Sequence, residues 1–241
     1  IRLLTVVWPD RDHAPHAGQF FTLRAWGADE APFLSRPISV HRWNPDSSTI
    51  EFLYQVVGEG TEKIAQLKMK DTFQLTGPMG NGFDVPDILS KYKKIAVVGG
   101  GIGTAPLLLL CKELCRAGVR PDLYVGFRDA SYGMESFVPW CHTIHLATDS
   151  GSEGHHGLVT DLLDVRNYDI VLTCGPMVMM RGVAKLCADA GVPCLASLEK
   201  KMACGLGACL GCTCHTKIGP VTVCKDGPVL SLIHISEPTR H

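Results

Sequence analysis

The chain has 241 residues, 46% of them hydrophobic, and its 23 Lys and Arg against 24 Asp and Glu leave a net charge of −1 at pH 7. This length suits one large domain or two of ordinary size, and the balanced charge gives no indication of a nucleic-acid partner or an anionic membrane surface. The longest apolar run, residues 105–111, is too short to cross a bilayer, and no signal-peptide pattern is recognisable.

The first part of the chain has the pattern of a small antiparallel barrel. Short segments rich in Val, Ile, Thr, Phe and Trp alternate with turn signals, and one short helix is expected near Thr61. The expected strands fall within residues 3–8, 18–26, 36–43, 49–57 and 71–77. Several short strands at this spacing predict an antiparallel β-barrel over residues 1–87.

From residue 95 the pattern changes to that of a parallel α/β sheet. Buried-type strands are expected at residues 95–100, 122–127, 143–148, 168–175 and 192–197, and helices at 106–118 and 177–191. Strands that alternate with helices predict a parallel sheet over residues 88–199, with the domain boundary inside residues 84–94.

Two glycine-containing turns follow strands of this second domain. The sequence VVGGGIGTAP ends a strand and opens a helix, so Gly101 and Gly103 could let the backbone approach a pyrophosphate at the helix N-terminus. The alternative is that this glycine-rich segment is only a tight turn and binds no ligand. The later turn Cys174-Gly175-Pro176 ends another strand and could face the same crevice, although by itself it is more typical of a simple strand-to-helix connection.

In the barrel half, two elements suit a second phosphate-bearing ligand. The segment RPIS begins with Arg36, whose guanidinium could bind a diphosphate, and the segment GEGT at residues 58–61 offers glycines and a hydroxyl at a helix start. A surface ion pair is the commoner role for a single arginine. The hypothesis of a phosphate-bearing ligand in this half therefore rests on the RPIS and GEGT segments together.

Eleven cysteines in a large chain with an ample core predict a metal site in a reducing cytoplasm rather than a disulfide scaffold. Cys204, Cys209 and Cys212 have the spacing C-x4-C-x2-C, and Cys224 follows on an expected strand. This is the plant-type [2Fe–2S] spacing, and the surrounding glycines let a loop curl around a cluster. A structural zinc site is the alternative, and Cys214 is the surplus thiol.

The order and spacing of RPIS, LYQVVGEGT, GGGIGTAP and CGP resemble the ferredoxin–NADP reductase superfamily, in which an FAD-binding barrel precedes a nicotinamide-binding α/β domain. The segments SLEKKMACGLGACLGCTC and VCKDGPV resemble, within it, the electron-transfer subunits of type B dihydroorotate dehydrogenase. This resemblance implies three units: residues 1–87 for FAD, 88–199 for NAD and 200–230 for a [2Fe–2S] cluster.

The resemblance also assigns site residues. FAD would contact Arg36, Pro37, Ile38, Ser39, Leu53, Tyr54, Gln55, Gly60 and Thr61. The nicotinamide nucleotide would contact Gly101, Gly103, Thr104, Cys174, Gly175 and Pro176. The iron ligands would be Cys204, Cys209, Cys212 and Cys224, and no catalytic acid–base residue is implied. The residues leave NAD and NADP open, because Arg128 could meet a 2′-phosphate, whereas the family favours NAD.

By the same resemblance, the chain is an electron-transfer subunit in pyrimidine biosynthesis. It would pass electrons from the FMN of a catalytic dihydroorotate dehydrogenase subunit, through the [2Fe–2S] cluster and FAD, to NAD+. A cytoplasmic heterotetramer with two copies of each subunit is implied, with no nucleic acid and no membrane. Two alternatives stay open: a diaphorase-type subunit of a sulfide dehydrogenase, hydrogenase or other ferredoxin–NAD(P) reductase complex, and a zinc-stabilised nucleotide-binding module.

Three features depart from the family pattern or from the rest of the chain. Gln55 stands where this branch commonly has arginine, and the gap from Cys212 to Cys224 is short for the family. Residues 231–241, SLIHISEPTRH, continue no preceding periodicity and resemble translated adapter sequence. We therefore expect this tail to be non-native.

Overall fold

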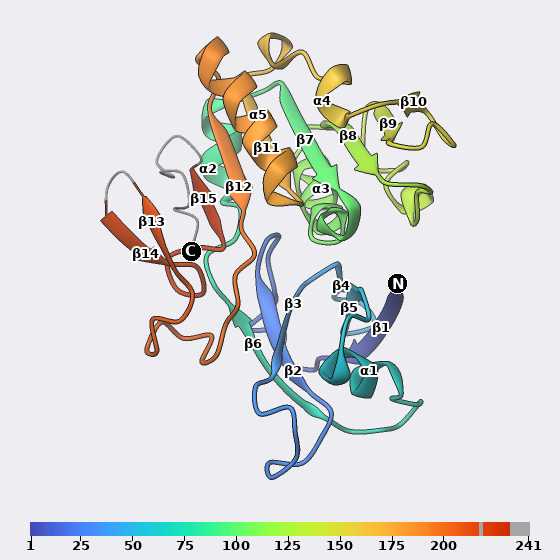
Figure 1. The fold of residues 1–241 in the computed structure, drawn as a ribbon, viewed down its shortest axis with the longest axis vertical. Coiled ribbons are helices and arrows are strands. Elements are labelled where there is room, and N and C mark those ends of the chain that lie inside the picture. The colour runs from blue at the N-terminus through green and yellow to red at the C-terminus, as the bar shows by residue number, and fades with distance from the viewer. Residues whose placement is uncertain (217–218, 232–241) are drawn as a thin grey trace.

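In the computed structural model, which describes residues 1–216 and 219–231, six short N-terminal strands form two antiparallel sheets (Figure 1). Along one strand, Ile50, Phe52 and Tyr54 are buried while the residues between them are half-buried, as expected when one face meets a core. The antiparallel β-structure predicted here is confirmed. The strand order of the first sheet is β1 (Arg2–Val7), β5 (Thr49–Tyr54), β4 (Arg42–Asn44). The order of the second is β3 (Arg36–Ser39), β2 (Phe20–Arg24), β6 (Gln74–Met79). The predicted helix is α1 (Glu59–Ala65).

The second region is a seven-stranded sheet in which all neighbouring strands are parallel except the last pair. The parallel sheet predicted for this region is thereby confirmed. Its order is β10 (His155–His156), β9 (Ile144–Thr148), β8 (Asp122–Phe127), β7 (Ile95–Gly100), β11 (Ile170–Cys174), β12 (Cys194–Ser197), β15 (Val229–Ser231). Its helices are α2 (Val85–Lys91), α3 (Leu107–Arg116), α4 (Val159–Leu162) and α5 (Met177–Ala190), with 3-10 turns at Gly101–Thr104, Met134–Ser136 and Val165–Asn167.

Alternation along the fully buried strand β7 decides which helices cover each face of the sheet. Ile95 and Val97 belong to a core that includes α2, α3 and the barrel, whereas Ala96 and Val98 belong to a second core with α4 and α5. One face of the sheet is therefore continuous with the barrel core through α3 (Figure 1). The predicted boundary segment, residues 84–94, contains α2, whose first turn is capped by the Asp84 carboxylate accepting a bond from Asp87 N at 3.0 Å.

The cysteine-rich unit is attached to both preceding regions. Its hairpin, β13 (Thr213–Thr216) with β14 (Gly219–Thr222), leads to β15, which pairs antiparallel with β12 at the edge of the parallel sheet (Figure 1). On the barrel side, Asn81 N donates to Gly227 O at 2.6 Å and Asn81 Nδ2 donates to Lys225 O at 3.0 Å. Ser231, the first residue of the tail predicted to be non-native, ends β15, and residues 232–241 lie outside the described part of the chain.

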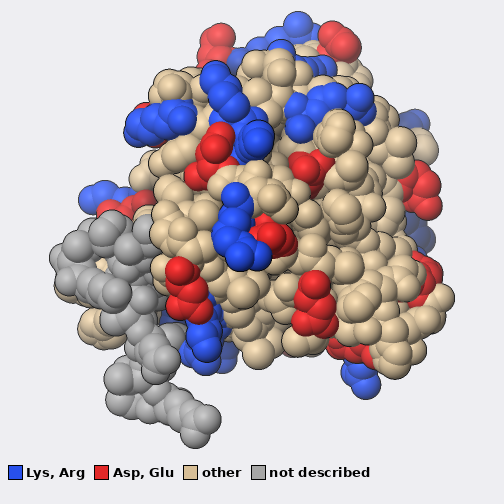
Figure 2. All heavy atoms as spheres, turned by 90° about the horizontal axis from the view of Figure 1, so that it is seen from above, with Lys and Arg blue, Asp and Glu red and all other residues tan. Residues whose placement is uncertain are grey.

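No helix within the described residues combines the length and the apolar character needed to cross a bilayer. The face at the top of Figure 1, seen end-on in Figure 2, carries Lys and Arg side chains interspersed with Asp and Glu. On this face the charges of the two signs are therefore mixed rather than segregated, in keeping with the near-neutral net charge.

Candidate functional site

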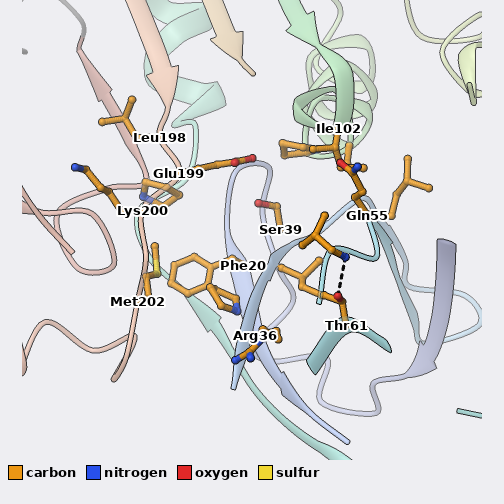
Figure 3. A pocket seen from close by; sticks show the side chains of 17 residues that line it. Phe20, Arg36, Ser39, Gln55, Thr61, Ile102, Leu198, Glu199, Lys200 and Met202 are labelled. Atoms are coloured by element: carbon orange, nitrogen blue, oxygen red, sulfur yellow. Dashed lines mark hydrogen bonds between the residues drawn. The ribbon is translucent and has the colours of Figure 1, made fainter. Parts of the chain in front are cut away.

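A cavity of about 400 Å³ lies where the barrel, the glycine turn and the segment after β12 meet (Figure 3). Seven of the nine residues predicted to bind FAD line it: Arg36, Pro37, Ile38, Ser39, Leu53, Gln55 and Thr61. The glycine-turn region contributes Ile102, Ala105 and Pro106, and the segment that leads to the cysteines contributes Leu198, Glu199, Lys200 and Met202. Three segments that are distant in sequence thus form one pocket.

The two remaining predicted FAD residues do not line the cavity. Tyr54 is buried in the barrel core, because alternation along β5 turns it to the opposite face from Leu53. Gly60 packs against Arg36, and a Cβ at Gly60 would lie 2.5 Å from the Arg36 Nε atom. The absence of a side chain at Gly60 therefore makes room for the guanidinium.

Arg36 has the surroundings of an anion-binding side chain. Its guanidinium lies 5.6 Å from the centre of the Trp26 ring and donates to the carbonyl of Leu34. Among the described residues, no ion pair joins Arg36 to a carboxylate, so the surface ion pair considered above is not observed. The guanidinium thus lines the cavity (Figure 3) without a neutralising charge.

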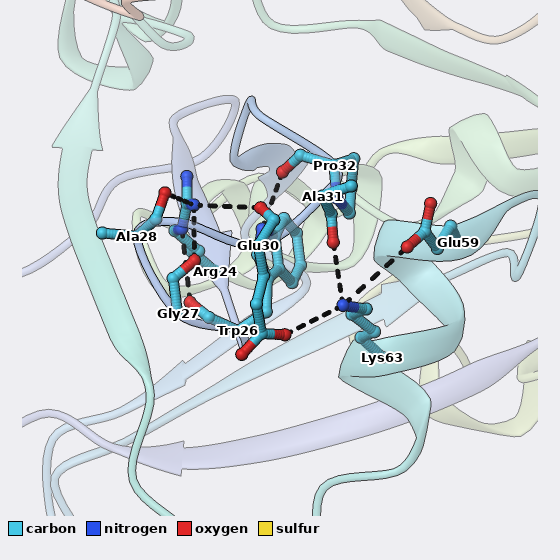
Figure 4. A network of polar contacts seen from close by, with 9 residues as sticks. All are labelled: Arg24, Trp26, Gly27, Ala28, Glu30, Ala31, Pro32, Glu59 and Lys63. Carbon is cyan, nitrogen blue, oxygen red and sulfur yellow. Dashed lines mark hydrogen bonds and ion pairs between the residues drawn. The ribbon is translucent and has the colours of Figure 1, made fainter.

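The loop that carries Trp26 is held by two cations (Figure 4). Arg24 Nη2 donates to Gly27 O at 2.7 Å and to Ala28 O at 3.0 Å. Lys63 Nζ donates to Ala31 O at 2.8 Å and pairs with Glu30 at 3.1 Å, which ties the loop to α1. This network fixes the ring against which Arg36 stacks.

Thr61 organises the GEGT turn through its hydroxyl. Its Oγ1 accepts bonds from Val57 N at 3.0 Å and Gly58 N at 3.2 Å, and it donates to Gly58 O at 2.8 Å. The hydroxyl therefore holds the turn in shape at the cavity wall, a role that its position in the motif did not reveal.

The two glycine-containing turns of the α/β domain touch each other. A Cβ at Gly103 would lie 2.4 Å from Gly175 Cα, so the backbones can approach this closely because Gly103 has no side chain. Thr104 is buried, and its Oγ1 donates to Gly101 O at 2.9 Å. Cys174 is also buried, and burial raises the pKa of its thiol to about 12, which makes it an inert packing residue.

A second cavity, of about 330 Å³, opens at the carboxyl ends of the parallel strands. Of the predicted nucleotide-binding residues, Gly101 and Pro176 line it, whereas Gly103, Thr104, Cys174 and Gly175 lie behind its wall. Arg128 lines it as well. Sequence reasoning missed the remaining polar groups, Asp149 and Thr160, because each follows a strand or turn with no recognisable motif.

The four predicted iron ligands are grouped in two pairs. Cys212 Sγ and Cys224 Sγ are 3.2 Å apart, and in the other pair Cys209 N donates to Cys204 Sγ at 3.4 Å. Gly207 N donates to Cys224 Sγ at 3.1 Å, which links the pairs. A [2Fe–2S] cluster requires two thiolates on each of two irons, so the donor set fits it. Within the described ranges, no three His, Cys, Asp or Glu side chains could hold a single metal ion.

The loop around Cys204 favours the thiolate form that metals bind. Bonds from the backbone N–H groups of Leu206 and Cys209 lower the pKa of the Cys204 thiol to about 6. The loop reaches this shape through positive φ angles at Gly205 (71°), Gly207 (82°) and Leu210 (57°). The loop conformation therefore directs backbone N–H groups at sulfur.

In the described part of the chain, Cys214 belongs to neither pair, although it shares an apolar cluster with Cys212 and Cys224. It is buried in β13 within an apolar cluster that includes Phe20 and Met79, and burial raises the pKa of its thiol. Cys224 was expected at the end of a strand, but β14 ends at Thr222 and Cys224 lies in the following turn. The Thr222 N–H and hydroxyl both donate to the Asp226 carboxylate, which closes this turn.

Relatives of known name resemble almost the whole chain. The electron transfer subunit of dihydroorotate dehydrogenase B (NAD(+)) from Clostridium acetobutylicum is 49% identical over 212 residues, which cover 88% of this chain and 82% of the relative. The corresponding subunit from Clostridium perfringens is 40% identical over 222 residues, covering 91% and 87%. The chain belongs to this family. The family resemblance inferred from the sequence is confirmed.

Other comparisons agree with membership of the dihydroorotate dehydrogenase B electron transfer family. The family model for the iron-sulfur cluster binding domain of dihydroorotate dehydrogenase B matches residues 199–235. A solved NADH-dependent reduced ferredoxin-NADP oxidoreductase superposes with a TM-score of 0.82 at 26% identity, covering 97% of this chain and 84% of that chain. A ferredoxin NADP+ reductase from Neisseria gonorrhoeae, with a TM-score of 0.60 at 18% identity over 78% and 85% of the two chains, shows the shared fold.

Helix α3 joins the barrel to the α/β domain through partly and fully buried polar groups. The Glu113 carboxylate accepts a bond from Ala17 N at 3.1 Å, and Lys112 Nζ donates to Trp43 O at 2.9 Å. Burial raises the pKa of Glu113 to about 7, although Arg116 and Lys112 act in the opposite direction. The interface therefore contains a carboxyl group that titrates near neutral pH.

We expect Glu113→Gln to stabilise the protein at high pH. Because the folded-state pKa of Glu113 lies above its unfolded value, its contribution is complete below about pH 4.5 and is lost as pH rises through about 7. Glutamine keeps the oxygen that accepts from Ala17 N but carries no charge. At pH 8 the variant should have a free energy of unfolding higher by about 1–3 kcal/mol. Urea unfolding at several pH values measures this, and a difference that does not change with pH would contradict it.

Proposed function

We propose that this chain transfers electrons between a catalytic dihydroorotate dehydrogenase subunit and NAD+, with FAD in the cavity lined by Arg36 and a [2Fe–2S] cluster on the four paired cysteines. The observation that carries the proposal is the position of the cavity, whose walls come from the barrel, the glycine turn and the segment that leads to the cysteines. Flavin chemistry suits this place because it converts single electrons into a two-electron hydride.

For FAD, the Arg36 guanidinium would bind the diphosphate, and Pro37, Ile38 and Ser39 with Leu53 and Gln55 would form the apolar and polar walls. Thr61 would line the cavity and shape its turn, while Gly60 leaves space for Arg36 and Tyr54 packs the barrel behind the wall. Phe20 lines the cavity and also belongs to the apolar cluster around Cys212 and Cys224, so its ring would lie between the two sites.

For NAD, Gly101 and Pro176 would contact the nucleotide directly at the carboxyl ends of the strands. Gly103, Thr104, Cys174 and Gly175 would set the shape of the two turns through the close backbone packing described above. The thiolates of Cys204, Cys209, Cys212 and Cys224 would hold the irons, while the N–H groups of the loop stabilise charge on sulfur. No side chain of this chain needs to act as a catalytic acid or base.

The partner would be the FMN-containing catalytic subunit, in a cytoplasmic heterotetramer of two copies of each chain. Co-expression with a dihydroorotate dehydrogenase B catalytic subunit should yield a complex that couples dihydroorotate oxidation to NAD+ reduction, while this chain alone oxidises NADH only with artificial acceptors. A yellow, iron-containing protein that forms no complex and confers no such coupling would instead favour the diaphorase-type reading.

Arg36→Ala should weaken FAD retention. The change removes a charge-assisted pair with the diphosphate, which contributes about 1.5–3 kcal/mol, so the dissociation constant should rise roughly tenfold to hundredfold. Flavin fluorescence on dilution measures release. Arg42→Ala is a matched control, because Arg42 pairs with Glu51 and does not line the cavity. Equal FAD retention in the Arg36 variant and the unaltered protein would refute the assignment.

A further inference from the structure

A buried hydrogen bond joins the two segments proposed to bind the cofactors. His41 follows the RPIS strand by two residues, and its Nδ1 lies 2.7 Å from the carbonyl oxygen of Ala105 in the glycine-turn segment. Ser39 and Ala105, at the two ends of this connection, both line the main cavity. The bond therefore crosses from the wall suited to FAD to the turn suited to the nicotinamide nucleotide.

The direction of the bond follows from its chemistry. A carbonyl oxygen can only accept, so His41 Nδ1 must carry the hydrogen. The ring is 6% exposed, and burial lowers its pKa, so the imidazole is neutral with its hydrogen on Nδ1. Arg42 and Glu51, the charged groups nearest to the ring, act on it in opposite directions.

Both ends of the bond are held by backbone contacts. His41 N donates to Glu51 O at 2.9 Å, which attaches the residue to β5, and Ala105 N donates to Ile102 O at 2.9 Å. Neither end can shift without breaking a further hydrogen bond. The spacing of Ser39 from Ala105 is thus constrained by a short hydrogen-bonded connection in addition to the packing of the shared core.

We propose that His41 is a positioning residue that sets the distance between the flavin-binding strand and the nicotinamide-binding turn, and so the alignment for hydride transfer. The inference rests on the proposed function. Hydride transfer is sensitive to such alignment, because a displacement of about 1 Å can cost roughly a hundredfold in rate. The other polar bonds of α3, from Lys112 and Glu113, lie farther along the helix and hold the domains together without contacting either cofactor segment.

The test compares three variants of the FAD- and cluster-loaded chain. His41→Leu removes the donor, and His41→Asn keeps an N–H donor near the position of Nδ1. Lys112→Met removes a different buried bond across the same interface, seven residues or roughly 10 Å farther along the chain. Stopped-flow measurement of flavin reduction by NADH gives the rate, and the charge-transfer absorbance of reduced flavin with NAD+ reports alignment. Amide hydrogen exchange of residues 101–105, without added nucleotide, reports the turn itself.

We expect His41→Leu to slow flavin reduction by about tenfold to a hundredfold, weaken the charge-transfer band and speed exchange at residues 101–105, with FAD and iron contents unchanged. His41→Asn should restore most of each signal, and Lys112→Met should lower the melting temperature while leaving reduction and the band unaltered. Equal rates, bands and exchange in His41→Leu and the unaltered chain would overturn the inference, as would equal loss in Lys112→Met. If NADH cannot reduce the flavin of the unaltered chain, the proposed function fails instead.

Discussion

Replacing any one of Cys204, Cys209, Cys212 or Cys224 by serine should abolish the [2Fe–2S] cluster, whereas Cys214→Ser should keep it. In the proposed site each of the four would contribute one thiolate to a pair that holds one iron, and a serine hydroxyl is a far weaker ligand at neutral pH. Among the described residues, Cys214 forms no such pair, although it shares an apolar cluster with Cys212 and Cys224. Iron and sulfide content, with electron paramagnetic resonance of the reduced protein, measures the effect.

Cys214→Ser is also the matched control for folding, since it changes a buried thiol of the same unit. We expect a loss of about 1–3 kcal/mol in stability for burying the hydroxyl, with normal iron content. A normal cluster in Cys224→Ser together with a lost cluster in Cys214→Ser would show that the fourth ligand is wrongly assigned. Zinc without iron in anaerobically prepared protein would return the zinc-stabilised module to consideration.

Gly103→Ala should be the most damaging methyl addition within the two glycine-containing turns. Its Cβ would lie 2.4 Å from Gly175 Cα and 2.7 Å from Cys174 O, and backbone atoms cannot turn aside as a flexible side chain can. The two turns must separate, which displaces Gly101 and Pro176 from the nucleotide cavity. We expect a stability loss of about 1–3 kcal/mol or more and near-complete loss of flavin reduction by NADH.

Comparing Gly101→Ala with Gly103→Ala distinguishes the effect of backbone strain from the effect of steric overlap. Gly101 has a φ of 52°, but a Cβ there would meet no atom within 4 Å. Its replacement should cost only about 1 kcal/mol of conformational strain and leave partial activity. Thermal unfolding and NADH-dependent flavin reduction compare the variants. If Gly101→Ala proves as harmful as Gly103→Ala, the contact between the two turns does not determine nucleotide binding.

Local patterns in the sequence predicted the fold class and its main elements. The continuous apolar run at β7, the alternation at β5 and the helical spacing in α3 each depend on neighbours within a few residues, and the structure shows all three elements. The cysteine spacing likewise predicted which sulfurs would lie together. The sequence did not reveal that the hydroxyl groups of Thr61 and Thr104 form hydrogen bonds with the backbone of their own turns.

Contacts between distant segments could not be read from these patterns. Phe20 and Lys200 line the same cavity as Arg36 although nothing in their local sequence marks them. The edge strand β15 is only three residues long and joins a sheet whose other strands lie far earlier in the chain. The positions of these residues and of β15 depend on how the three regions of the chain pack together. A short segment has no periodicity from which such packing could be predicted.

The double attachment of the cysteine-rich unit has a kinetic consequence. Because β15 pairs with β12 while Asn81 bonds to residues of the cysteine-rich unit, this unit is fixed to both the sheet and the barrel. If a cluster on the cysteine loop exchanges electrons with a flavin in the main cavity, as proposed, the exchange would require no swinging of one domain toward another. Its rate should therefore be independent of solvent viscosity, unlike the diffusive domain motions that limit many multidomain redox proteins.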